Sequence, residues 1–348
     1  MDNTKISKFL SRKISVLSAM LTLMVVFIHF TASCHLYVGE CYSIFAHIQD
    51  YIGQGITRNA VPLFFFISGL LAFWYSDSPK KLMGGAKKRL RTLGIPYLIW
   101  NCIATVFFFA LDYLNSGAVP TLSVGMVINC ILNNQYNGPL WYVQKLLIYS
   151  IAAPLIFLVI KDRKRFIAIF VLTLFQQVFL YDYAPGLFFY IAGAGAAVHY
   201  KNLLNKKTES KIIVVFTLVF LALQICRINL FDPKVSIDVL RNTTICRLYE
   251  VFSPIMLWVV SDIVSFDKTK STWIEKHTFS IYVTHYMVLS IVTSNTMSSL
   301  LHLPTNSFFI ALLFLFGMPV SVYTITVLIF HWFSRKCPFV YGFIMGGR

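Results

Sequence analysis

The chain has 348 residues, of which 57% are hydrophobic and 13% charged, whereas a soluble domain carries about 25% charged residues. Its 32 phenylalanines and repeated apolar runs of bilayer-spanning length exclude an ordinary soluble protein. We expect an all-α, polytopic integral membrane helical bundle. It forms a single transmembrane domain over residues 1–348, with a short basic N-terminus, 1–13, and a C-terminal tail, 333–348.

The formal net charge of +16 does not indicate nucleic acid. The basic residues stand in short clusters between apolar runs, which is the pattern of cytoplasmic loop ends. We therefore attribute the charge to membrane topology and expect no nucleic-acid partner.

Seven cysteines are scattered without a CxxC or any metal-ligand spacing, so we expect no metal site. Cys34 and Cys41 fall in one predicted outer loop, and a disulfide between them stays open. The N-terminal run is long for a cleaved signal and contains a histidine, which favours a retained first span.

Ten stretches approach the roughly 20 residues needed to cross a bilayer. They are residues 14–33, 56–76, 93–114, 139–160, 166–182, 186–200, 211–230, 246–265, 278–298 and 307–332.

The positive-inside rule supports an even number of spans with both termini cytoplasmic. With that topology, 24 of the 30 lysines and arginines fall on the inner side. The longest outer connections are 34–55, 115–138 and 228–245. The six exceptions are Arg58, Lys145, Arg227, Lys234, Arg241 and Arg247.

His29 lies near the far end of the first span, in hydrocarbon surroundings. An imidazole in a bilayer is costly unless it faces the protein interior or a wet cavity, so His29 is a functional candidate. The alternative is a packing histidine with its polar atoms satisfied.

Arg58 opens the second span and, like His29, lies in the outer half of the predicted bundle. A cation beside an imidazole suits stabilisation of an anion or orientation of a base. The alternative is an arginine whose side chain reaches the membrane interface.

Three further polar positions stand out. His285 is a second intramembrane histidine, and Lys145 follows Trp141 and Tyr142 without an evident partner. Arg247 and Glu250 are three residues apart on one helix and can pair. No GxSxG, P-loop or HExxH motif occurs, so these residues alone do not separate an enzyme from a transporter.

Six segments in order resemble the acyltransferase 3 family of membrane enzymes that acylate sugars and lipids. They are VVFIHF around His29, Arg58 with the following VPLFF and Ser68-Gly69, KKRLRTLGIPYLIW, GPLWYVQKLLIYSIAAPLI from Gly138, GLFFYIAGAGAAV from Gly186 and FSIYVTHYMVL from Phe279.

The resemblance implies a catalytic role for His29, as general base or as relay of the acyl group, and a role for Arg58 in holding donor phosphates or an oxyanion. It also implies substrate contacts at Trp141 and Tyr142, which can stack on a sugar. Ser68, Lys145 and His285 are further substrate-binding candidates.

One position departs from the family pattern, which commonly has a basic residue eleven positions before the histidine. Here that residue is Ser18, on the same helix face as His29 and about 16 Å away. Either another cation such as Lys145 substitutes, or the donor is held differently, or this copy is impaired.

The resulting hypothesis is an O-acetyltransferase of a bacterial inner membrane. Its acyl donor is cytoplasmic acetyl-CoA. The expected acceptor is a hydroxyl of a cell-surface polysaccharide or its lipid-linked precursor, and the expected partners are membrane lipid and a polysaccharide biosynthesis complex. The alternatives are an exporter of polysaccharide or lipid-linked sugar and an inactive scaffold of such a complex.

Overall fold

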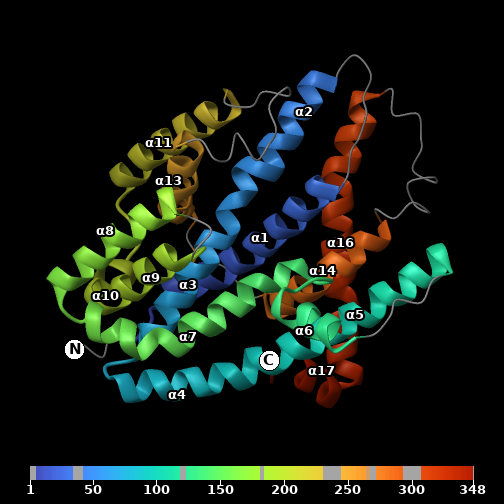
Figure 1. Cartoon of the computed structure of the whole chain (residues 1–348). Coiled ribbons are helices and arrows are strands. Elements are labelled where there is room, and N and C mark those ends of the chain that lie inside the picture. The colour runs from blue at the N-terminus through green and yellow to red at the C-terminus, as the bar shows by residue number, and fades with distance from the viewer. Residues whose placement is uncertain are drawn as a thin grey trace.

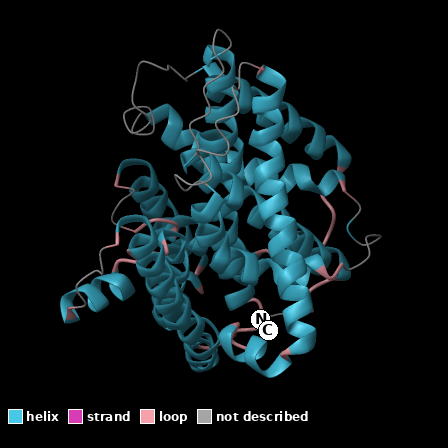
Figure 2. Cartoon of the chain, turned by 90° about the vertical axis from the view of Figure 1, so that its right-hand side faces the viewer, coloured by secondary structure: helices cyan, strands magenta, loops and turns pink. Residues whose placement is uncertain are grey.

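The computed structural model describes residues 5–33, 42–117, 123–180, 184–229, 244–264, 266, 272–292 and 307–347. Within these ranges the chain is helical and contains no strand, as predicted (Figure 2). Cys34 and Cys41, between which a disulfide stayed open, lie outside the described residues.

The helices form a bundle whose elements are coloured by residue number in Figure 1. In chain order the elements are α1 (Lys8–Ser33), α2 (Tyr42–Asp50), η2 (Tyr51–Gly55), η3 (Ile56–Asn59), α3 (Ala60–Phe73), α4 (Pro79–Arg89), η4 (Leu90–Gly94), α5 (Ile95–Ser116), α6 (Val124–Leu132), η5 (Gly138–Leu140), α7 (Trp141–Ile160), α8 (Arg163–Phe179), α9 (Leu187–His199), α10 (Lys201–Leu204), α11 (Ser210–Asn229), α13 (Thr244–Val260), η7 (Ser261–Ile263), η9 (Ile274–His277), α14 (Thr278–Val292), α16 (Phe308–Lys336) and α17 (Pro338–Ile344).

Each of the ten predicted spans contains one of these helices, and seven helical stretches of the described chain are long and apolar enough to cross a membrane. The helices of the other three ranges are shorter. Helices α8 and α9 have 17 and 13 residues, and α14 has 15 described residues. The count of ten crossings and the cytoplasmic placement of both termini therefore stay predictions.

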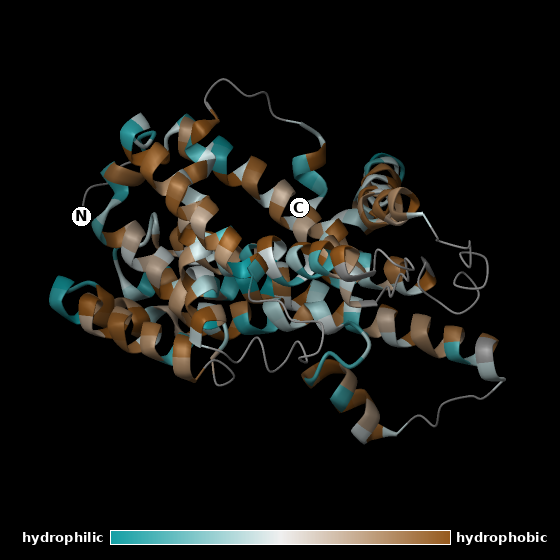
Figure 3. Cartoon of the chain, turned by 90° about the horizontal axis from the view of Figure 1, so that it is seen from above, coloured by the Kyte–Doolittle hydropathy of each residue, from teal (hydrophilic) through white to brown (hydrophobic). Residues whose placement is uncertain are grey.

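Hydrophobic residues make up much of the peripheral helices, and hydrophilic residues also lie within the bundle (Figure 3). Leu155 of α7, Leu218 of α11 and Leu313 of α16 are among the exposed large apolar residues. Exposed leucines in such number are expected where the solvent is lipid rather than water.

The helix of the predicted second span begins fourteen residues earlier than expected, because the described part of the predicted outer loop 34–55 is helical as well. Phe45 of α2 and Ile52 of η2 are buried in one apolar cluster with Phe27 and Phe30 of α1. Packing of η2 on α1 and of α2 on α16 explains why the segment is a helix rather than a loop.

Helix α1 likewise begins at Lys8, inside the predicted N-terminal tail. Two acidic residues compensate its charges. Lys13 Nζ lies 2.5 Å from Asp262 Oδ1 and 4.0 Å from the centroid of the Trp258 ring, and Arg12 pairs with Glu275 at 2.5 Å. Arg12 lowers the pKa of Glu275 by hydrogen bonding to it. These partners allow both cations to enter the bundle.

Helices α3 and α9 form the tightest crossing, and they lie side by side in Figure 1. A Cβ atom added at Gly69 would lie 2.1 Å from the Tyr190 carbonyl oxygen, and one at Gly193 would lie 2.0 Å from the Phe66 carbonyl oxygen. Glycine at both positions is what lets the two backbones approach so closely.

The two described ends of the chain pack at the same end of the bundle, which also carries the lysines of α4. Ser7 bonds to Asn205 just after α10, and Gly346 lies against the carbonyl of Thr92 in η4. We call this the basic end. The predicted C-terminal tail is folded there, since α17 is helical and Trp100 Nε1 donates to the carbonyl of Ile344.

Candidate functional site

His29 and Arg58 line one small cavity of about 100 Å³, which we call the histidine cavity. It lies where α1, η3 and the start of α7 meet, and α8, α9 and α13 close its sides. Its polar lining comes from His29, Arg58, Trp141, Gln177 and Glu250. The chain thus brings together two catalytic candidates and one of the predicted sugar-stacking residues.

An irregular helical segment places Arg58 there. The π-helical turn η2 precedes the 3₁₀ turn η3 that carries Arg58. A Cβ atom at Gly53 in η2 would lie 2.1 Å from the Thr31 hydroxyl oxygen, two positions after His29. Close approach of η2 to α1 thus requires glycine, and π-helical turns occur frequently at functional sites.

The guanidinium of Arg58 is oriented by its own helix. Nε donates to the side-chain oxygen of Gln54 at 2.9 Å, and Nη2 donates to the same oxygen. An arginine held in this way has a fixed orientation, which suits recognition of a phosphate or an oxyanion.

His285 of α14 packs against His29, with ring centroids 5.2 Å apart. Its Nδ1 lies 2.7 Å from the Tyr282 carbonyl oxygen. Because a carbonyl oxygen only accepts, Nδ1 carries the hydrogen and Nε2 carries a lone pair. Nε2 is buried and has no hydrogen-bond partner within the described chain.

A second cavity of about 500 Å³ lies toward the basic end, and we call it the basic cavity. Its polar lining includes Ser18, Ser68, Lys88, Arg89 and Tyr142. Two of the predicted substrate-binding residues, Ser68 and Tyr142, are therefore here rather than in the histidine cavity. Their hydroxyl oxygens lie 3.0 Å apart.

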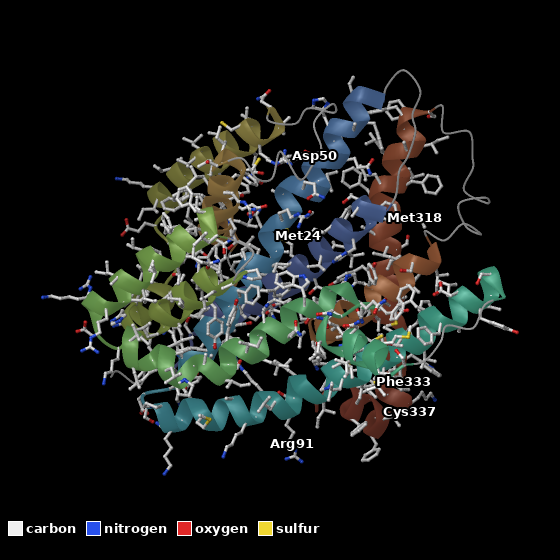
Figure 4. All side chains as sticks on the ribbon, viewed as in Figure 1. Met24, Asp50, Arg91, Met318, Phe333 and Cys337 are labelled. Carbon is white, nitrogen blue, oxygen red and sulfur yellow. The ribbon has the colours of Figure 1, made fainter. Side chains whose placement is uncertain are left out.

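Arg89 and Arg91 differ in direction although they are two residues apart. Arg91 is exposed and points away from the bundle at the basic end (Figure 4). Arg89 points inward, where Nη1 donates to Ser150 Oγ at 2.9 Å and Nη2 to the Ser68 carbonyl oxygen at 3.3 Å. Of these two arginines, Arg89 is the one that lines the cavity.

Ser18 now has a structural context. Its hydroxyl donates to the Ile14 carbonyl oxygen at 2.7 Å, so it carries no charge into the basic cavity. Lys88 and Arg89 line that cavity with Ser18. Lys145 lines neither the basic cavity nor the histidine cavity. The nearby cations come from the α4–η4 junction rather than from α7.

Helix α3 separates the two cavities. Val61, Pro62 and Phe65 face the histidine cavity, and Phe64, Ser68 and Leu71 face the basic one. At the start of α7, Trp141 and Tyr142 face opposite sides of this partition in the same way.

Glu250, Gln177 and Arg89 are site residues that the sequence did not single out as such. Glu250 and Arg247 pair at 4.0 Å, as the i,i+3 spacing predicts, but Glu250 also lines the histidine cavity. A carboxylate inside a predicted span was the available signal. Arg89 belongs to a basic cluster that the sequence analysis attributed to a cytoplasmic loop end. Nothing in the sequence indicated that its side chain points into the bundle.

Buried polar groups stabilise the segment before Arg58. Asp50 and Arg227 pair at 2.9 Å. The side-chain oxygen of Gln224 accepts hydrogen bonds from Tyr51 at 3.0 Å and Tyr249 at 2.8 Å. This network joins α11 and α13 to the α2–η2 helix, and it thereby supports the turn that positions Arg58.

Comparison with protein-family models identifies the family of this chain. The model of the acyltransferase 3 family, described as an acyltransferase domain, matches residues 12–340 and so includes every candidate residue named above. No match was found among curated proteins or among solved structures.

Proposed function

Because this chain belongs to the acyltransferase 3 family and has several helices able to span a membrane, we propose that this membrane acyltransferase is an O-acetyltransferase of surface glycans. The donor is acetyl-CoA and the acceptor is a hydroxyl of a cell-surface polysaccharide or of its lipid-linked precursor. The enzyme resides in a bacterial inner membrane, where the donor is reached from the cytoplasmic face and the acceptor from the outer face.

The observation that carries the proposal is the pairing of a histidine with an arginine in a very small cavity. Binding sites for whole ligands usually measure about 300–1,000 Å³, whereas the histidine cavity measures about 100 Å³. It has room for reacting groups only. The bulk of each substrate then occupies neighbouring space, and the basic cavity suits the phosphates of the donor.

The chemistry needs a base, an anion-stabilising group and a path for one proton. His29 takes the proton of the acceptor hydroxyl as the oxygen attacks the thioester carbonyl. Arg58 stabilises the negative charge that forms on the carbonyl oxygen. When the carbon–sulfur bond breaks, the leaving thiolate takes the proton from the His29 imidazolium, so that ester and free thiol are the products.

On the donor side, Lys88 and Arg89 bind the phosphates of acetyl-CoA, and the thioester extends past Tyr142 and the α3 partition toward His29. Charge from these two residues replaces the charge that the family commonly carries at the position of Ser18. This favours an active enzyme over an inactive scaffold.

The test uses membranes from cells that express each variant with its cognate glycan. We expect His29→Ala to lower glycan acetylation by about 10²–10⁴-fold and Arg58→Ala by about 10²–10³-fold. Arg91→Ala is the matched control, because its exposed side chain points away from the bundle, and it should retain wild-type acetylation.

Unchanged acetate ester in the His29 and Arg58 variants would refute the site assignment. The exporter hypothesis is tested separately by incubating purified wild-type protein with radiolabelled acetyl-CoA and acceptor glycan. Label in the glycan supports the acetyltransferase, and glycan transport into vesicles without label supports the exporter.

A further inference from the structure

A third cavity, of about 420 Å³, lies among α3, α8, α9 and α13. We call it the apolar cavity, because its lining is almost wholly hydrocarbon and aromatic. Phe66 and Trp258 form one wall with ring centroids 5.0 Å apart, and Phe170 and Phe188 form another, also at 5.0 Å. The reaction proposed above uses none of these side chains.

The floor of the apolar cavity is a helix face of small residues. Ala192 and Ala196 of α9 are four residues apart and both line it, so they lie on one face, one turn apart. The neighbouring positions Gly193 and Gly195 face elsewhere, against Phe66 and Phe166 respectively. A larger side chain at either alanine would occupy the cavity itself.

The cavity borders the lipid. Ile167 of α8 and Ile255 of α13 line it and are also exposed at the bundle surface. Helix α13 is long and apolar enough to cross a membrane and α8 lies in a predicted span, so the molecules expected at this opening are hydrocarbon chains of the bilayer.

The apolar cavity adjoins the histidine cavity and not the basic one. Phe189 lines both the apolar and the histidine cavities and lies between them. The apolar and basic cavities share no lining residue and lie against different faces of α3. A chain in the apolar cavity therefore lies next to the histidine cavity, across Phe189, and away from the donor side.

We propose that the apolar cavity binds the hydrocarbon anchor of a lipid-linked sugar, which is the acceptor, and that this places the sugar hydroxyl at His29. The proposal rests on the proposed acetyl transfer and selects the lipid-linked precursor over a finished polysaccharide. The chain runs along α9 from Phe189 toward Tyr200, about 16 Å at 1.5 Å per residue.

The first experiment fills the cavity. Purified Ala192→Leu and Ala196→Leu are compared with Ala168→Leu, a matched control at an exposed position on α8. Each is assayed with radiolabelled acetyl-CoA and two acceptors, a long-chain polyprenyl-phosphate-linked sugar and the same sugar as a water-soluble methyl glycoside.

For the lipid-linked acceptor, we expect kcat/KM to fall about tenfold in the two cavity variants, while the methyl glycoside rate and the control stay within about twofold of wild type. Equal losses with both acceptors, or no loss with either, would overturn the proposal.

The second experiment does not depend on acetyl transfer. A polyprenyl-phosphate-linked sugar with a diazirine in its chain is photolysed with wild-type protein and with Ala196→Leu in phospholipid vesicles, and labelled peptides are mapped. Labelling of α8 or α9 that Ala196→Leu removes supports the chain site, even if acetyl transfer fails. Labelling that excess ordinary phospholipid displaces completely assigns the cavity to bulk lipid and overturns the proposal.

Discussion

The bundle contains two clusters of histidines, and their hydrogen bonds differ. At the basic end, His277 bonds through both ring nitrogens: Nδ1 lies 3.0 Å from the Tyr341 hydroxyl and Nε2 lies 3.4 Å from His331 Nδ1. Beside His29, the ring of His285 is tilted by 44° against the His29 ring; its Nδ1 donates to the Tyr282 carbonyl oxygen, and its Nε2 has no partner within the described chain.

Burial does not distinguish these two histidines, since His277 and His285 are both buried, and from their hydrogen bonds we predict that His277 is structural and His285 reactive. A ring with both nitrogens bonded joins neighbouring helices, and taking up a proton there requires its hydrogen-bond partners to rearrange. A ring with a free lone pair beside a second imidazole is available for proton transfer or for orienting its neighbour. The predictions below test this distinction.

Of the three predictions that test this distinction, the largest effect is expected at His285. Two substitutions there separate the contributions of its two ring nitrogens. His285→Asn keeps a donor near the Nδ1 position and removes Nε2. We expect kcat to fall about tenfold or more. His285→Gln keeps a polar group near Nε2 and should retain more activity. Acetyl transfer by purified protein measures both, with thermal unfolding as a check on folding. Equal activity in both variants would show that the free nitrogen has no role.

A smaller effect of a different kind is expected at the basic-end cluster. Tyr341→Phe removes the hydroxyl that bonds His277 Nδ1 and Ser280 Oγ, each at 3.0 Å. Leaving such buried groups unsatisfied costs about 1–3 kcal/mol. We expect a lower midpoint of thermal unfolding and an unchanged rate per folded molecule. A reduced rate at unchanged stability would place this cluster in the reaction and contradict the distinction.

The smallest effect is a pH dependence of stability. Burial, then the neighbouring His331 and Lys276, lower the pKa of His277. A group with a lowered folded-state pKa contributes stability that is present above its unfolded value and is lost as the pH falls, here below about 6.5. Thermal midpoints of wild type should therefore decrease from pH 7 to pH 5, and the decrease should be smaller in His277→Gln. Parallel curves for the two proteins would contradict the assignment.

The sequence alone allowed much of the fold to be predicted. Apolar runs of bilayer length locate all ten helical ranges, since no other environment tolerates them. Residues 42–55 were harder, because their helix depends on burial of Phe45 and Ile52 in an apolar cluster with residues of other helices rather than on length or composition. Tertiary contact decided that segment.

The candidate site divides in the same way. His29 and Arg58 were visible in the sequence because a titratable group within an apolar run is costly and demands a reason. The sequence did not show which of the candidate residues lie close together in space. Residues from separate helices meet in three places. The ring of His285 packs against that of His29. Glu250 and Arg58 line one cavity, and Arg89 and Ser18 line another.

The sequence by itself determined that this chain is a membrane bundle with a polar site at His29. Only the tertiary structure decided that three cavities adjoin around α3, one basic, one apolar and one that holds the histidine. The physical reason is that membrane insertion depends on the hydrophobicity of each segment separately, whereas a cavity depends on how several helices pack.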